Sequence, residues 1–251
     1  MTEETRRDTE QTPSACQADA LPIELQPHAR EANGRKSVAP SLASPDPHNK
    51  YRLLDLFCGA GGAAMGYHRA GFEVVGVDIN PQPHYPFEFH QADAMTYPLD
   101  GFDAIHASPP CQRYSSMTRI AETHPNLYGA TRDRFLSSGM PWVIENVIGA
   151  PYHYGLVLCG SMFGLPVRRH RNFETSWLFL GGLQCDHEGQ GRPITVTGYG
   201  GGRPRPHSWK GVKAEWPEYM GMPWASPEEC TQAIPPAYTE YIGKQLLAVL
   251  S

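Results

Sequence analysis

The pentapeptide Ser108-Pro-Pro-Cys-Gln112 places a thiol directly after two prolines. Prolines lack an amide N–H and have a fixed φ, so this segment is a stiff turn that holds one side chain in place. The turn follows an apolar run, 102–107, which is typical of a buried strand. Because α/β proteins carry their chemistry at the carboxyl edges of strands, Cys111 is a candidate nucleophile. An inert cysteine in a proline-rich loop is the competing interpretation.

A second group of residues has the pattern of a cofactor site. Gly59-Ala-Gly-Gly-Ala-Ala64 fits the glycine pattern of dinucleotide-binding folds, and Asp78 follows where a ribose-binding acid is expected. An NAD-dependent oxidoreductase is therefore one interpretation. Asp55, however, lies directly before the glycines, where a carboxylate suits an ammonium group better than a pyrophosphate. S-adenosylmethionine carries an ammonium, so a methyltransferase is the second interpretation.

Charged residues later in the chain add two further candidates. Glu145 ends the apolar run 141–145, and a basic run follows at Arg168, Arg169 and Arg171, which in isolation is also compatible with a solvated surface. Residues 190–214 hold five basic residues and no acid, with aromatic residues between them. This mixture suits contacts to phosphates and bases, and a flexible glycine-rich loop is the alternative.

The elements that must position these residues alternate along the chain. Apolar runs predict strands at 51–57, 73–78, 87–90, 102–107 and 141–145, and helical patterns predict helices at 63–70, from about 131 to 138, and at 235–250. Alternation with glycine or an acid at the strand ends predicts a parallel α/β sheet with a crevice above it. Beyond residue 155 we expect short strands only, at 168–173, 175–180 and 194–197.

Length and composition bound the remaining possibilities. The 251 residues favour one domain with at most a small appendage, and the net charge of -5 argues against a strongly basic nucleic-acid coat. Six cysteines without paired spacing and no membrane-length apolar run predict a protein of the reducing cytoplasm. Cys159, Cys185 and His187 match no zinc-finger spacing and give three ligands, so we predict no metal site.

The motifs that contain these residues occur in one order: Asp55 to Gly62, Pro109 to Gln112, Glu145-Asn-Val147, and Arg169-His-Arg171 with Phe173. In this order they resemble the cytosine-C5 DNA methyltransferase family, and the resemblance covers Tyr51 to Ser251. It implies a Rossmann-like, S-adenosylmethionine-dependent α/β fold with a mostly parallel sheet and a small irregular target-recognition lobe. The domains expected are a disordered tail at 1–49, a catalytic domain at 50–174 and 216–251, and target recognition at 175–215.

The resemblance also implies a role for each residue. Cys111 adds to cytosine C6, Glu145 contacts N3 and the exocyclic amine, and arginines at 169 and 171 hold the base and lower the thiol pKa. The cofactor site consists of Phe57, Gly59, Gly61, Asp78, Ile79, Asp93 and Pro109. A loop that closes over a flipped cytosine begins after Cys111, and DNA contacts are expected from Arg113, Ser115, Arg203, Arg205, Trp209 and Lys210.

Two alternatives share the catalytic set: a tRNA cytosine-C5 methyltransferase and a catalytically silent DNA-binding relic. The recognition region is shorter than in restriction-associated members, which suggests a monomeric enzyme of a bacterial cell or of a phage-infected host. The chain departs from the family at Thr231-Gln-Ala-Ile-Pro-Pro236, where the family usually has Gly-Asn. That departure puts the geometry around the amino-acid end of the cofactor in doubt.

Overall fold

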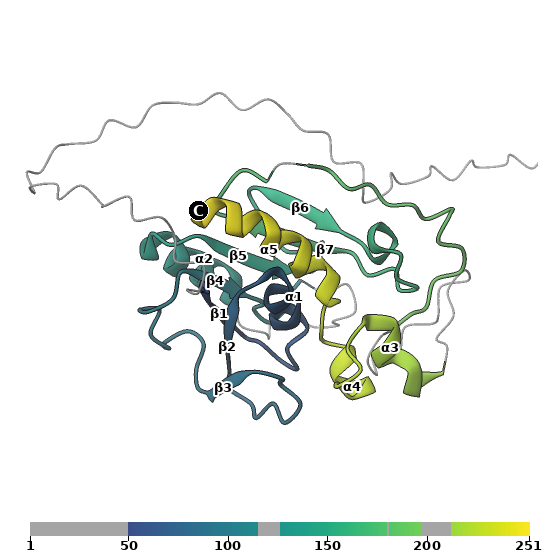
Figure 1. Cartoon of the computed structure of the whole chain (residues 1–251), viewed down its shortest axis with the longest axis horizontal. Helices are drawn as coiled ribbons and strands as arrows, with labels where there is room; N and C mark the ends of the chain where they lie inside the picture. The colour runs from purple at the N-terminus through teal and green to yellow at the C-terminus, as the bar shows by residue number, and fades with distance from the viewer. Residues whose placement is uncertain (1–49, 115–125, 180, 197–211) are drawn as a thin grey trace, which may run out of the picture. The chain divides into compact units, whose positions relative to one another are not determined.

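The computed structural model describes residues 50–114, 126–179, 181–196 and 212–251, all within one compact unit, Pro45–Ser251. A seven-stranded sheet lies at its centre (Figure 1), with the strand order β3-β2-β1-β4-β5-β7-β6. The strands are β1 (Arg52–Leu56), β2 (Glu73–Asp78), β3 (Glu88–Gln91), β4 (Ala104–Ala107), β5 (Trp142–Asn146), β6 (Gly155–Leu158) and β7 (Arg171–Thr175).

The sheet has a parallel part and an antiparallel end. β1 pairs in parallel with β2 and β4, β2 with β3, and β4 with β5, whereas β7 runs antiparallel to both β5 and β6. The chain order reverses between β1 and β4, so the loops after these strands diverge and leave a crevice at their carboxyl ends. The prediction of a mostly parallel, Rossmann-like sheet is confirmed.

Helices cover both faces of the sheet. Alternating residues of β1 point to opposite faces, so Leu53 packs into the cluster beneath α1 (Gly62–Ala70) and α5 (Pro236–Leu250), and Leu54 into the cluster beneath α2 (Leu127–Ser138). α1 and α5 lie side by side (Figure 1). A Cβ at Gly66 of α1 would lie 2.1 Å from Thr239 Oγ1, so this contact requires glycine.

A third, smaller core joins distant segments of the chain. It contains Val167 from before the predicted recognition region, Val196 from within it, and Trp216 and Met220 from after it, together with Ala60 of the glycine loop. The short helices η3 (Lys213–Glu215), α3 (Trp216–Met220) and α4 (Pro227–Cys230) build this lobe, which sits apart from α1 and α5 in Figure 1. Of these helices, only η3 lies within the predicted recognition region 175–215; α3 and α4 follow it.

Several expected elements differ in position. α2 begins at Leu127 rather than near 131, and the strand expected at 168–173 begins at Arg171. The expected strand at 175–180 is absent among the described residues after Thr175, and 194–197 contributes only an isolated bridge, Val167 to Ile194. β6 and the lobe helices were missed, because four- and five-residue elements carry too short a pattern to be read from periodicity.

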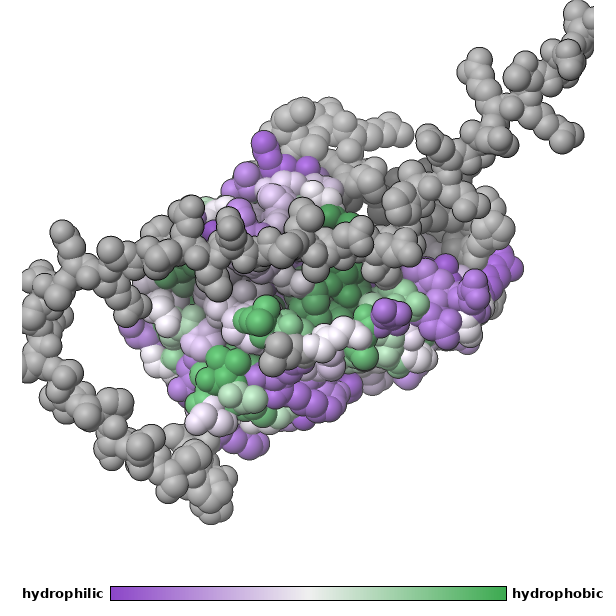
Figure 2. Space-filling model, turned by 90° about the horizontal axis from the view of Figure 1, so that it is seen from above, coloured by the Kyte–Doolittle hydropathy of each residue, from purple (hydrophilic) through white to green (hydrophobic). Residues whose placement is uncertain are grey.

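Most large apolar side chains are buried, with a few exceptions at the surface. Leu178 is 83% exposed and Ile79, directly after β2, is 65% exposed. Seen from above, apolar and polar residues share the face formed by the described residues (Figure 2). Among the described residues, no helix combines the length and apolar character needed to cross a membrane.

Candidate active site

The glycine loop after β1 is bent by left-handed residues. Phe57, Gly59 and Gly61 have φ values of 56°, 50° and 81°, which brings three successive turns into a short space. A Cβ at Gly61 would lie 2.8 Å from Pro86 Cδ and 3.0 Å from the Tyr85 ring, so the loop tolerates only glycine there. Trp224 Nε1 donates to the Ala60 carbonyl at 2.9 Å and ties the loop to the small lobe.

Asp78 ends β2 beside this loop. One of its carboxylate oxygens accepts from the Gly59 amide at 3.2 Å and the other from the Asn80 amide at 3.0 Å. Each oxygen keeps a second acceptor direction, which is what two ribose hydroxyls require. The neighbouring Ile79 exposes its apolar side chain, as a residue that covers an adenine would.

Asp55 is a buried carboxyl with weak partners among the described residues. Its side chain is 0% exposed, neither oxygen has a hydrogen bond of good geometry, the Ala64 backbone lowers its pKa, and His106 Nε2 lies 4.0 Å from Oδ1. Burial raises its pKa well above the usual range, and the nearby Asp78 charge raises it further. A buried acceptor at the carboxyl end of β1 fits an ammonium-bearing ligand such as S-adenosylmethionine.

Two further residues of the predicted cofactor site have structural partners. Asp93 caps a turn: one carboxylate oxygen accepts from the Met95 amide at 2.8 Å, and its carbonyl accepts from the Thr96 and Tyr97 amides. Pro109 is buried, and its carbonyl accepts from Asn146 Nδ2 at 2.9 Å. The second contact locks the turn before Cys111 onto the end of β5.

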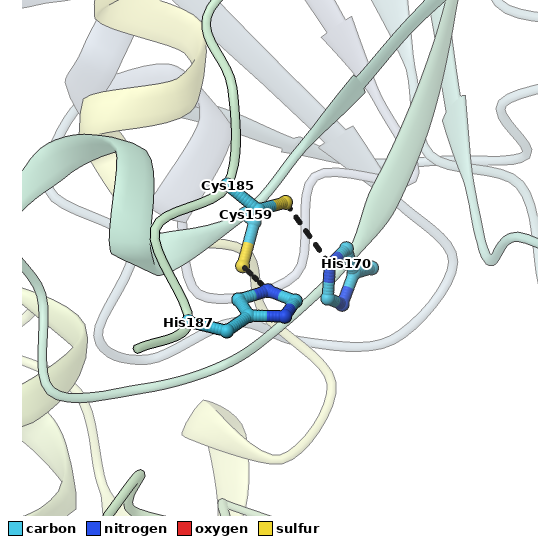
Figure 3. Close-up of side chains that lie close together, drawn as sticks. All are labelled: Cys159, His170, Cys185 and His187. Atoms are coloured by element: carbon cyan, nitrogen blue, oxygen red, sulfur yellow. Dashed lines mark hydrogen bonds between the residues drawn. The ribbon is translucent and has the colours of Figure 1, made fainter. Parts of the chain in front are cut away.

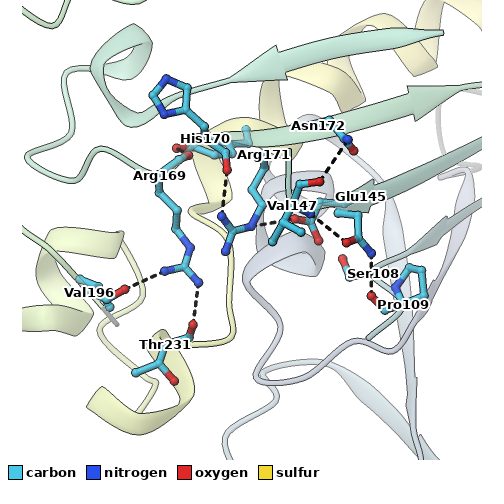
Figure 4. A network of polar contacts seen from close by, with 12 residues as sticks. Ser108, Pro109, Glu145, Val147, Arg169, His170, Arg171, Asn172, Val196 and Thr231 are labelled. Atoms are coloured by element: carbon cyan, nitrogen blue, oxygen red, sulfur yellow. Dashed lines mark hydrogen bonds and ion pairs between the residues drawn. The ribbon is translucent and has the colours of Figure 1, made fainter. Parts of the chain in front are cut away.

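Cys111, Glu145 and Arg171 converge at the ends of β4, β5 and β7. Arg171 Nε lies 3.0 Å from Glu145 Oε1, and both side chains are largely buried (Figure 4). Burial raises the pKa of Glu145, against the opposing effects of Arg171, of a Ser108 hydrogen bond and of Arg169. The Cys111 thiol is half-buried, and the charges of Glu145, Arg171 and Arg169 all shift its pKa.

Arg171 and Arg169 lower the pKa of the Cys111 thiol, as expected from the sequence, but the net shift of that pKa is upward. Burial and the Glu145 carboxylate both raise the pKa of the thiol, and together they outweigh Arg171 and Arg169, which lower it. Arg171 forms an ion pair with Glu145, so the negative charge of Glu145 offsets much of the effect of Arg171 on the pKa of the thiol. Activation of the thiol therefore requires a change in this arrangement when substrate binds.

Arg169 and Arg171 contact different parts of the protein. Arg169 turns away from the catalytic group, and its terminal nitrogens donate to the Val196 carbonyl at 3.0 Å and the Thr231 carbonyl at 2.7 Å (Figure 4). Its own carbonyl accepts from Tyr238 Oη at 2.6 Å. Burial lowers the pKa of Arg169 to about 9, so the group stays charged near neutral pH. Of the two predicted base contacts, only Arg171 meets Glu145.

A buried chain of hydrogen bonds reaches Glu145 from behind the site. Tyr67 Oη lies 3.0 Å from His106 Nδ1, and His106 Nε2 lies 3.0 Å from Ser108 Oγ, whose hydroxyl bonds Glu145. Burial lowers the pKa of His106 to about 3, so the ring is neutral. One assignment satisfies every step: Tyr67 donates to Nδ1, Nε2–H donates to Ser108, and Ser108 donates to the carboxylate. The sequence signal was a histidine inside an apolar strand.

The predicted DNA contacts fall largely outside the described residues. Ser115, Arg203, Arg205, Trp209 and Lys210 all lie there, and so does most of the predicted closing loop. Arg113 is half-buried two residues after Cys111. Tyr114 Oη donates to Asn126 Oδ1 at 2.5 Å, so the residues on either side of 115–125 contact each other.

Comparisons with known proteins agree with this geometry. Residues 51–128 match the family model of C-5 cytosine-specific DNA methylases. Type II methyltransferase M1.HphI of Haemophilus parahaemolyticus is 35% identical over 89 residues, which is 28% of this chain and 23% of the relative. The chain thus matches less than a quarter of that relative's length.

Solved structures extend the likeness to most of the chain, as a likeness of fold. A DNA modification methyltransferase encoded within an E. coli prophage superposes with a TM-score of 0.56 at 16% identity, over 80% of this chain and 99% of that one. The S. pombe Dnmt2 methyltransferase gives 0.55 at 15% identity, over 81% and 100%. The sequence similarity to C-5 cytosine-specific DNA methylases is thus confined to residues 51–128, whereas the likeness of fold extends over about four fifths of the chain.

Proposed function

We propose that the protein is a DNA (cytosine-5-)-methyltransferase that uses S-adenosylmethionine. The observation that carries this proposal is the convergence of Cys111, Glu145 and Arg171 at three strand ends, beside the glycine loop. An NAD-dependent oxidoreductase offers no role for a thiol next to a paired carboxyl group. The family match over residues 51–128 covers the loop, Asp78 and Cys111, and supports the same reaction.

The reaction begins with covalent attack by Cys111. The thiol gives its proton to water, the sulfur donates an electron pair to C6 of cytosine, and the C5=C6 electrons are displaced so that C5 becomes nucleophilic. Glu145, whose pKa is raised by burial, is suited to supply a proton or hydrogen bond at N3. Arg171 lies beside Glu145, where its guanidinium can contact the base oxygen O2.

S-adenosylmethionine supplies an electrophilic methyl group when it is bound. In this chain, Asp78 would hold the ribose hydroxyls, Asp55 the ammonium group, and Ile79 one face of the adenine. The backbone of Gly59 and Gly61 allows close approach, with Phe57 and Pro109 at the rim and Asp93 near the adenine amine. After methylation, C5 loses its proton to water, and the electrons of that C–H bond expel the Cys111 thiolate from C6.

The cytosine must leave the helix for this chemistry, because C5 and C6 are stacked between neighbouring bases in duplex DNA. We propose that the loop from Gln112 to about Thr131, which carries Arg113 and Ser115, closes over the flipped nucleotide. Residues 175–215 then contact the DNA through Arg203, Arg205, Trp209 and Lys210, with 50–174 and 216–251 as the catalytic domain. We propose a monomer that acts in the cytoplasm of a bacterial or phage-infected cell.

Bisulfite sequencing of DNA from cells that express the protein tests this function. We expect protected cytosines within a recurring short sequence for the wild-type chain and none for Cys111→Ser. The same purified chain is assayed with labelled S-adenosylmethionine on duplex DNA and on tRNA. Label on tRNA alone, or label on DNA that persists in Cys111→Ser, contradicts the proposal.

A further inference from the structure

Two cysteines and two histidines meet outside the catalytic site. Cys159 follows β6, His170 precedes β7, and Cys185 and His187 lie in the segment 181–191 that follows β7 (Figure 3). One donor atom of each residue lies within 4.8 Å of the other three. The segments are brought together by the fold, since the four residues span 159 to 187 without a regular spacing.

The distances between donors match a tetrahedral metal site. Cys159 Sγ lies 3.5 Å from His187 Nε2, and Cys185 Sγ lies 3.4 Å from His170 Nε2. Zn²⁺ bound at its usual S and N distances would separate adjacent ligand atoms by about 3.3–3.8 Å. The two imidazole rings stand at 85° to one another with centroids 5.1 Å apart, so they do not stack. Their Nε2 atoms are the ones turned toward the thiols.

The surroundings hold the donors in place. Arg168 donates to the His187 carbonyl at 2.9 Å and to Gln190 Oε1 at 3.0 Å. Gln190 Nε2 in turn donates to the Leu165 and Val167 carbonyls. This network fixes the 186–191 turn against the start of the β7 segment, as partners outside the ligand shell do in protein metal sites.

We propose that Cys159, His170, Cys185 and His187 bind one Zn²⁺ as a closed, structural site. The expectation of no metal site counted three ligands and missed His170, which lies in the basic run and takes part only through the fold. The metal would pin the segment after β7 to the β6–β7 end of the sheet. Because His170 lies between Arg169 and Arg171, it would also fix the backbone that positions both arginines.

The proposed site belongs to the reduced protein. Cys185 is disulfide-bonded in the structure, whereas Cys159 is a free thiol. A disulfide sulfur cannot also be a zinc thiolate, so the two states of Cys185 exclude each other. The absence of paired cysteine spacing predicts a reducing compartment, in which the zinc-bound state is available.

Zinc content of the full chain, purified with a reducing agent from zinc-supplemented cells, tests the site. We expect about one zinc ion per chain, and below about a tenth of that for Cys185→Ala and His187→Ala. Matched controls are Cys230→Ala and His153→Ala, which remove the same groups outside the cluster and should keep the metal. A wild-type chain without zinc, or full zinc content in Cys185→Ala, overturns the proposal.

Cobalt substitution gives a readout that does not depend on activity or on a variant's stability. Co²⁺ added to the reduced, metal-free wild-type chain should produce the visible bands of a tetrahedral ion and a thiolate-to-metal absorption that zinc then abolishes. The spectrum of an octahedral, hydrated Co²⁺ ion overturns the proposal. So does mass spectrometry that finds Cys185 still in a disulfide in the reductant-treated, zinc-supplemented chain.

Discussion

The parallel part of the sheet and its antiparallel end hold their functional residues by different means. Around β1, β2 and β4, the loops are fixed by main-chain geometry: a left-handed turn at Gly61, the Asp78 contacts and the buried Pro109 turn. Around β6 and β7, the same task falls to long polar side chains, such as Arg168 and Arg169, and to the Cys/His cluster.

The difference follows from what lies beneath each part. The parallel strands lie between α1 and α5 on one face and α2 on the other. The packed cores on both faces therefore hold the strand ends in place. β6 is an edge strand, and in the part of the segment after β7 that the structure describes, one isolated β-bridge joins Ile194 to Val167. Substitutions of the residues that meet at the catalytic group should therefore cost turnover, and those of the polar side chains that hold the antiparallel end, such as Arg168 and Arg169, should cost stability.

The largest effect on turnover is expected for a substitution of Glu145. Glu145→Gln keeps the shape of the side chain but removes the group that can protonate the base, so kcat should fall by about 10²–10⁴-fold. The melting temperature should change little. Timed methyl-transfer assays measure kcat, and thermal unfolding measures the melting temperature. A Glu145→Gln variant with a near wild-type kcat would show that Glu145 has only a structural role.

Arg169 and Arg171 give the sharpest contrast, because they are two residues apart. Arg169→Met leaves the Val196 and Thr231 carbonyls without their donor and should lower the free energy of unfolding by about 2–4 kcal/mol. Arg171→Met should instead lower kcat/KM for DNA, at a smaller cost in stability. Denaturant unfolding and steady-state kinetics of both variants test the split; the reverse assignment contradicts it.

A smaller effect is expected at Ser108. Ser108→Ala removes the hydroxyl between His106 and Glu145, so the carboxyl loses a hydrogen bond that lowers its pKa. The pH dependence of kcat should shift so that the limb governed by Glu145 moves to higher pH. Ser108→Thr, which keeps the hydroxyl, is the control. An unchanged pH profile in Ser108→Ala would show that the hydrogen bonds from Tyr67 through Ser108 to Glu145 do not affect the reaction.

His106 predicts the smallest effect, on stability against pH. Its folded pKa is about 3 against 6.5 in the unfolded chain, so between these values the unfolded chain binds more protons. This contribution to stability is present above pH 6.5 and is lost as the pH falls. The wild-type advantage over His106→Gln should shrink by about 2 kcal/mol between pH 7.5 and pH 5 in urea unfolding. An equal advantage at both values contradicts it.

The same contrast explains what the sequence could predict. Asp78 and Glu145 were readable because each terminates an apolar run, and Asp55 was readable because it lies in the strand just before the glycine loop; in a parallel sheet such strand ends share one edge. β6 and the place of His170 were not readable, since their partners lie in segments that only the tertiary fold brings close. The direction of the Cys111 pKa was missed because the sequence does not reveal that Arg171 is paired with Glu145.

The most direct test of the account is covalent capture at Cys111. Fluorine at C5 of cytosine cannot leave as the proton does, so methyl transfer to 5-fluorocytosine in duplex DNA should leave the base bonded to the enzyme. The account predicts a denaturation-resistant protein–DNA complex for the wild-type chain and for Cys230→Ala, mapped by mass spectrometry to Cys111, and none for Cys111→Ser. A complex that persists in Cys111→Ser, or methyl transfer without any such complex, would contradict it.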